Sequence, residues 1–162
     1  MNTFLLTMKS YSALLEQLDQ TPRQIAELTQ SLSREQWRSA PNGKWSIAIH
    51  VGHLLTIESL WIGRMDNFVL GHDTLRAWNG TNQDTLDGRF NEQNPKGILE
   101  DFESIRTAHV QLMRKYEGRA GELSAMHPST GKQMTLHEHA FTMLEHDYQH
   151  IEYIKGLLPP TS

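Results

Sequence analysis

Two histidines near the end of the chain have the spacing of a metal site. His146 and His150 lie four residues apart in the stretch LEHDYQH. Residues four apart share one face of a helix, so both imidazoles can reach a single ion at the usual Zn–N distance of about 2.0–2.1 Å. The chain has nine histidines among its 162 residues, and random placement gives roughly 0.4 pairs at this spacing. The pair alone is therefore a weak signal, and a third ligand is needed.

A candidate third ligand lies in an apolar segment far upstream. His53 has Leu54, Leu55 and Ile57 around it, and this pattern predicts that it faces the interior of a helical protein. A buried imidazole needs a partner for its ring nitrogens, so His53 is either a metal ligand or a core histidine bonded to a backbone carbonyl. His50 lies about 60° away around the same helix and is the next candidate.

Four further side chains lie near these histidines along the sequence. Glu58 either accepts the free N–H of a ligating histidine or acts as a general base, or it forms an interhelical salt bridge. Asp147 and Glu145 point about 100° to either side of His146, which predicts solvated surface positions. His139 lies two turns before His146, about 10 Å along the axis, and there it lines a pocket or packs in the core.

The charge and the cysteine content narrow the classes of protein. The formal net charge is −4, and Lys and Arg are scattered singly, so neither nucleic acid nor an anionic membrane is an expected partner. The chain has no cysteine, and a metal would therefore bind His, Asp or Glu. The N-terminus has no signal-peptide pattern, and no apolar run approaches a membrane span of about 18 residues. We expect a cytoplasmic protein with one domain over residues 1–162.

Helix signals recur along the chain. A short helix within residues 9–20 is expected to end before Thr21, which can cap a new long helix with Pro22 in its first position and Gln24 completing a capping box. The next long helix is predicted to begin at Ser46 and to run to Gly71, with apolar residues on several sides.

Two more long helices are predicted after a polar connection. One begins at Asn94 and Pro95 and ends before Gly118, and the last follows a capping box of Thr135 and Glu138. Together the four predict an all-α fold, a four-helix bundle, in which cofactor sites are built from inward side chains of facing helices.

The connection over residues 72–94 is rich in Gly, Asn and Asp and is longer than most structureless loops, so we interpret it as a lid. Its Arg76, Trp78, Asn79 and Arg89 are candidates for substrate contact, since arginine suits carboxylates.

Three stretches together resemble a known family. The segments TPRQIAELTQSLSREQW, KWSIAIHVGHLLTIE and TMLEHDYQHIEYI are similar to those of the DinB/YfiT-like four-helix-bundle metalloproteins, over residues 21–154. In that family a Trp-Ser or Trp-Thr pair opens the second helix, a His-Leu step eight residues after the Trp gives one ligand, and His-x-x-x-His gives two. Trp45, His53, His146 and His150 occupy those positions. The resemblance implies a long crossover connection, frequent homodimers and a divalent ion, nickel or zinc.

Several functions follow from a three-histidine site. Three imidazoles leave an open position, where an ion activates water for hydrolysis or binds the thiolate of a small cosubstrate. The resemblance implies thiol S-transferases that use bacillithiol or mycothiol. The leading hypothesis is a metal-dependent transferase or hydrolase of a small molecule. The alternatives are a non-catalytic metal-binding or stress-related bundle, and a metal-free interaction domain whose histidines are core residues.

Overall fold

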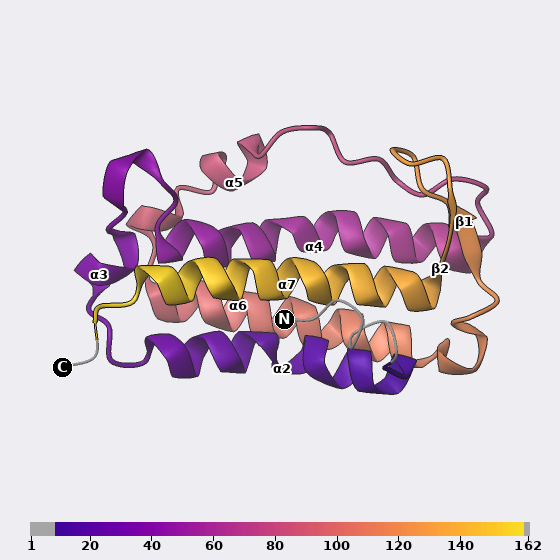
Figure 1. Ribbon diagram of the computed structural model, residues 1–162, viewed down its shortest axis with the longest axis horizontal. Coiled ribbons are helices and arrows are strands. Elements are labelled where there is room, and N and C mark those ends of the chain that lie inside the picture. Colours follow the sequence, from indigo (N-terminus) through magenta and orange to yellow (C-terminus); the bar gives the residue numbers. More distant parts are fainter. Residues whose placement is uncertain (1–8, 161–162) are drawn as a thin grey trace.

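Four long helices run side by side in the computed structural model, which describes residues 9–160 (Figure 1). They are α2 (Tyr11–Thr29), α4 (Ile47–Leu70), α6 (Pro95–Arg114) and α7 (Leu136–Leu157). Helices α2 and α4 each pack against both α6 and α7, so α2 and α4 occupy opposite corners of the bundle. The all-α four-helix bundle predicted from the sequence is confirmed.

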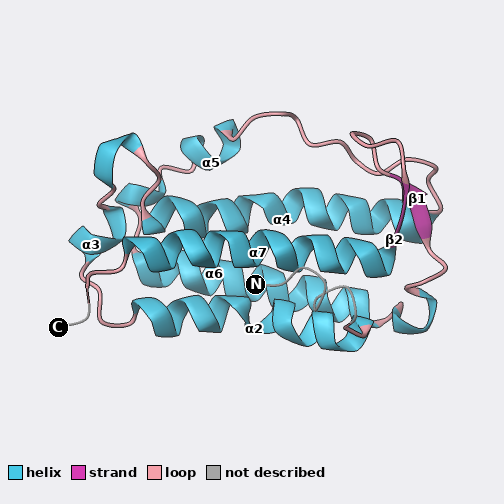
Figure 2. Cartoon of the chain, in the orientation of Figure 1, coloured by secondary structure: helices cyan, strands magenta, loops and turns pink. Residues whose placement is uncertain are grey.

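A long crossover connects α4 to α6. The two helices run in the same direction, so the chain returns along the outside of the bundle between them (Figure 1). This connection contains a short helix, α5 (Gln83–Asp87), and a 3-10 turn, η2 (Phe90–Glu92). It gives the crossover predicted by the resemblance, and Figure 2 shows α5 over the bundle where the sequence predicted a lid.

The ends of α4 and the starts of α6 and α7 lie where the capping residues predicted them. The hydroxyl of Ser46 accepts from the third N–H of α4, and Gly71 ends that helix in the left-handed conformation with φ 69°. Asn94 caps α6, and Thr135 forms a capping box with Glu138 at the start of α7. These short-range bonds satisfy backbone groups that a helix end leaves without partners.

The predicted helix start at Thr21 and Pro22 is wrong, because α2 continues through both residues. Pro22 has no N–H, so the carbonyl of Leu18 loses its partner within the helix. The guanidinium of Arg106 donates to that carbonyl at 3.0 Å and replaces the missing bond. The Thr21 hydroxyl donates to Asp147 on α7 at 2.7 Å instead of capping a helix. Contacts with α6 and α7 thus explain why Thr21 and Pro22, which are typical of a helix start, lie inside α2.

A two-stranded sheet between α6 and α7 was not predicted. Strands β1 (Ser124–Met126) and β2 (Gln133–Thr135) pair antiparallel, with Ala125 opposite Met134. Each strand has only three residues, too few for an alternating pattern to be visible in the sequence. The remaining short elements are α3 (Arg34–Arg38), η1 (Pro41–Gly43) and η3 (Glu117–Arg119).

A layer of charged residues divides the core into two apolar clusters. Arg106 has no exposed surface and forms ion pairs with Glu58 at 2.6 Å and Asp147 at 2.5 Å. The predicted surface position of Asp147 is therefore wrong. On each long helix the polar residue of this layer lies between members of the two clusters, as Arg106 does between Phe102 and Val110.

No helix within residues 9–160 combines the length and the apolar character needed to cross a membrane. The prediction that the N-terminus lacks a signal sequence rests partly on residues 1–8, which lie outside the described residues.

Candidate metal centre

The three predicted metal ligands come together between two helices. His53 lies on α4, and His146 and His150 lie on α7, which packs directly against α4. One ring nitrogen from each lies within 4.8 Å of the other two. The spacing of four residues on α7 places its pair one above the other, and the antiparallel α4 brings the third imidazole against them. The group is therefore of a size that fits one ion.

Hydrogen bonds determine which nitrogen of His53 faces this group. The Thr56 hydroxyl donates to the backbone carbonyl of His53 at 3.1 Å, so its oxygen is the acceptor for the Thr85 hydroxyl at 2.9 Å. Thr85 in turn accepts from Nδ1–H of His53 at 3.0 Å. Since a neutral imidazole carries a single proton, the Nε2 lone pair of His53 is left for a metal.

The nitrogens have the separation of two ligands on one ion. Nε2 of His53 lies 3.2 Å from Nε2 of His146. Two tetrahedral ligands at Zn–N distances of about 2.0–2.1 Å are separated by about 3.3 Å. The other ring nitrogen of His146 is buried and has no hydrogen-bond partner within residues 9–160. The observed pair therefore fits a shared ion.

His50 contacts His150 without joining the three-histidine group. Its Nδ1 lies 2.9 Å from Nδ1 of His150, and when His150 is the donor in this contact, its Nε2 carries the lone pair that can face an ion. Trp45, the residue that the resemblance placed at the start of this helix, packs against the rings of His50, His53 and His150. A bond through one nitrogen and stacking on the ring face together fix the orientation of His150.

The three imidazoles are uncharged at neutral pH. Burial lowers the pKa of His53 to about 4. Burial, followed by the neighbouring His53, lowers the pKa of His146 to about 4. Burial and the surrounding imidazoles lower the pKa of His150 to about 2. A histidine must be neutral to bind a metal, so the protein environment keeps all three in the ligating form.

Glu58 and His139, which the sequence also indicates as candidate site residues, lie outside the three-histidine group. Both carboxylate oxygens of Glu58 are bonded, one to Arg106 and the other to Nδ1 of His109 at 2.9 Å, which is the salt-bridge alternative. Burial opposes ionisation of Glu58, but Arg106 and His109 outweigh it and lower its pKa. His139 is buried and packs against the rings of Trp61 and Phe68, outside the three-histidine group.

The site borders open space on two sides. One cavity of about 450 Å³ is lined by His50, His53 and His150 together with Trp45 and Tyr153. A second cavity, of about 160 Å³, begins at His53 and extends beneath the crossover. A ligand can therefore approach the histidines without displacing a helix.

The sequence-based interpretation missed Thr85 and Arg106. Thr85 lies in the irregular crossover, where no periodicity indicates which side chains face the bundle. Arg106 carried a usable signal, since it lies four residues after Phe102 and three before His109 on the predicted inward face of α6.

Comparison with known proteins agrees with this architecture. The sequence model described as the DinB superfamily matches residues 17–154, which confirms the resemblance. Among solved structures, YfiT from Bacillus subtilis superposes with a TM-score of 0.76 at 17% sequence identity, covering 91% of this chain and 85% of that one. It is described as a probable metal-dependent hydrolase with an unusual four-helix bundle topology. No curated protein matches this sequence significantly.

Proposed function

Since this chain belongs to the DinB superfamily, we propose that it is a metal-dependent hydrolase of a small molecule, with a divalent ion on His53, His146 and His150. One observation carries the proposal: Nε2 of His53 and Nε2 of His146 are 3.2 Å apart, and the tautomer of His53 leaves its lone pair in that gap. The description of YfiT as a probable metal-dependent hydrolase supports the same class of activity.

The bound ion would acidify water and polarise the oxygen of a bond to be hydrolysed. The protein supplies the orientation of the ligands and a sheltered approach. Thr85 holds the ring of His53, and His50 holds that of His150. Trp45 covers the imidazoles from one side and lines the larger cavity. Three neutral ligands beside open space are typical of catalytic metal sites, whereas structural sites are closed by a fourth protein ligand.

Several finer properties belong to the same proposal. We expect nickel or zinc, since imidazole suits both ions and availability decides between them. A low-molecular-weight thiol is the alternative cosubstrate, because the chain has no cysteine of its own to supply a thiolate. We also propose a single domain over residues 1–162 that pairs as a homodimer, which sedimentation at micromolar concentration measures. We propose that Glu58 contributes to the site only indirectly, as part of the charged layer, because its two carboxylate oxygens are already bonded to Arg106 and His109.

Elemental analysis of protein purified without a polyhistidine tag tests the metal. We expect about one ion per chain in the wild type and its loss in the double variant His146→Ala/His150→Ala. His72→Ala, which removes an exposed histidine on the crossover, is the matched control and should keep the ion. Unchanged metal content in the double variant would overturn the three-histidine site.

Activity is then measured on a panel of esters and amides, with the ion removed by a chelator and restored. Hydrolysis that is lost and regained with the ion supports the proposal. Turnover that requires bacillithiol or mycothiol would assign the chain to transferases instead. A metal-loaded protein that is silent on both panels would indicate a bundle that binds its ion for stability alone.

A further inference from the structure

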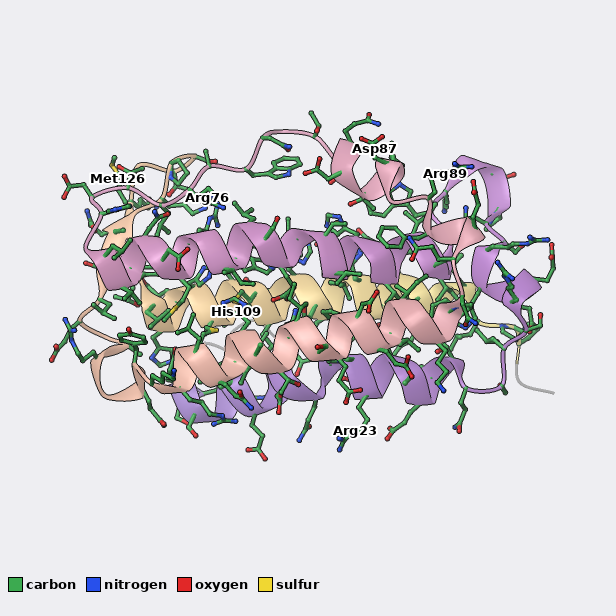
Figure 3. All side chains as sticks on the ribbon, turned by 180° about the vertical axis from the view of Figure 1, so that it is seen from behind. Arg23, Arg76, Asp87, Arg89, His109 and Met126 are labelled. Carbon is green, nitrogen blue, oxygen red and sulfur yellow. The ribbon has the colours of Figure 1, made fainter. Side chains whose placement is uncertain are left out.

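The cavity beneath the crossover extends well beyond the metal centre. Its lining includes His53 and Thr85, which are in contact, and Arg76, whose guanidinium lies against Gly63 further along α4. Figure 3 shows Arg76 between the crossover and α4, whereas Arg23 projects from the opposite edge of the bundle. The cavity volume is about 160 Å³, and Trp78 contributes a half-exposed indole to its wall. The proposed hydrolytic site does not use the far end of this cavity.

The position of Arg76 is fixed by one face of α4. Its backbone N–H donates to the Asn67 side chain at 2.6 Å, and its carbonyl accepts from Arg64 at 3.0 Å. Its guanidinium lies against Gly63, where a β-carbon would overlap Cζ, and Nη1 reaches the carbonyl of Ser59 at 3.5 Å. The absence of a side chain at residue 63 thus provides the space in which this cation rests.

The charge of Arg76 is not neutralised by a neighbouring carboxylate. None of the ion pairs within residues 9–160 includes this residue. Asp84 lines the same cavity but forms no salt bridge with it. A guanidinium offers a planar set of N–H donors that matches a carboxylate, and a preorganised one loses less entropy on binding. The free donors at this end of the cavity are therefore suited to an anionic group.

We propose that Arg76 binds a carboxylate of the substrate at the end of the cavity remote from the metal centre. This inference rests on the proposed hydrolase and specifies its substrate class. His53 and Gly63 are ten residues apart on α4, which corresponds to about 15 Å along the helix axis. The substrate is accordingly an extended molecule, with its hydrolysable group at His53 and its carboxylate about 10–15 Å away.

Binding of a designed pair of probes to the zinc-loaded protein tests the inference. Hydroxamates bind an open position on zinc, so the probes are monohydroxamates of α,ω-dicarboxylic acids with roughly four to twelve carbons. Each is compared with the same chain ending in a neutral carboxamide, and affinities are measured by calorimetry. At the chain length that spans the cavity, we expect the carboxylate to bind about tenfold more tightly than the carboxamide, as for a part-exposed charge-assisted hydrogen bond.

Four variants separate the role of Arg76 from general electrostatics. Arg76→Gln should abolish the tenfold preference, and Gly63→Ala should weaken it, because the new methyl displaces the guanidinium while the charge stays on the chain. Asp84→Asn removes a negative charge from the same cavity and should preserve or increase the preference. Arg23→Gln, on the opposite edge of the bundle, should leave it unchanged. Zinc content and melting temperature confirm that each variant is folded and loaded.

The outcomes distinguish this inference from the proposed function. Equal binding of carboxylate and carboxamide at every length, or a preference that survives Arg76→Gln, would overturn the role of Arg76 and leave the metal site intact. Failure of every hydroxamate to bind the zinc-loaded protein would instead overturn the open position on which the proposed function depends.

Discussion

Replacing Arg106 by methionine should destabilise the protein strongly, because it leaves two buried carboxylates without a counter-ion. Arg106, Glu58 and Asp147 all have 0% exposed surface. Removal of one partner from a buried ion pair costs about 3–5 kcal/mol, since the remaining charge is not solvated. The carbonyl of Leu18 also loses its donor, at about 1 kcal/mol. We therefore expect the free energy of unfolding at pH 7 to fall by about 4–6 kcal/mol, a large part of the 5–15 kcal/mol typical of a domain.

Urea unfolding followed by far-UV circular dichroism measures this change. The experiment is done with a chelator present, so that metal binding contributes nothing to the stability. With a slope of about 2 kcal/mol per molar, the midpoint should move down by about 2–3 M. Arg23→Met is the matched control, because Arg23 is an exposed arginine on α2, and its effect should stay within about 0.5 kcal/mol.

A compensating variant decides whether uncompensated charge causes the loss. Arg106→Met combined with Glu58→Gln and Asp147→Asn removes the charges from all three positions, so it should recover at least half of the lost stability. A loss below about 1 kcal/mol in Arg106→Met alone would refute the reasoning, since it would mean that the two carboxylates are protonated or solvated in the folded protein.

Three further predictions follow from single contacts. Thr85→Val removes the acceptor for Nδ1–H of His53 and should weaken zinc binding about 10- to 100-fold in a competition titration. Gly52→Ala puts a methyl into the Phe90 ring and should lower the free energy of unfolding by about 1–3 kcal/mol in urea. Burial, followed by nearby cationic groups, lowers the pKa of His139 to about 3. Between about pH 6.5 and pH 3 this histidine is therefore protonated in the unfolded chain and neutral in the folded protein. Stability should therefore fall as the pH decreases from about 6.5 to 3, by up to about 1.4 kcal/mol per pH unit from this residue, and the slope should be smaller in His139→Met.

The helix boundaries could be predicted because their causes are local. Ser46 and Gly71 delimit α4, and Thr135 with Glu138 opens α7. Each of these signals depends on residues within one helical turn, so the sequence contains the whole interaction. The local geometry of a cap is therefore enough to predict where a helix begins or ends, without knowledge of the neighbouring helices.

The errors arose where distant residues decide the outcome. Thr21 and Pro22 have the local pattern of a helix start, yet Asp147 and Arg106 provide the partners that allow α2 to continue. Asp147 was expected at the surface because it points away from His146, but its direction alone does not reveal that Arg106 occupies that side. Both errors share one cause, a buried arginine that was not recognised on α6.

The three-histidine group could be predicted from the sequence, and the residues that support it could not. His146 and His150 have a spacing with a geometric meaning, and the resemblance supplied the position of His53. Thr85 reaches His53 only because the crossover folds back over α4, and the contact of His50 with His150 depends on how α4 and α7 pack. Such contacts depend on the path of the chain in space, which spacing along one helix does not describe.

The charged layer and the three-histidine group are linked through neighbouring residues of α7. His146 and Asp147 differ by about 100° around the helix, so each rotation of α7 that moves one moves the other. Arg106 donates to both oxygens of Asp147, at 2.5 and 3.0 Å, and the Thr21 hydroxyl donates to one of them. These directional bonds allow few rotations of α7, and the one they select brings His146 to 3.2 Å from His53. Apolar residues in this layer would stabilise the bundle comparably but would define the rotation less sharply.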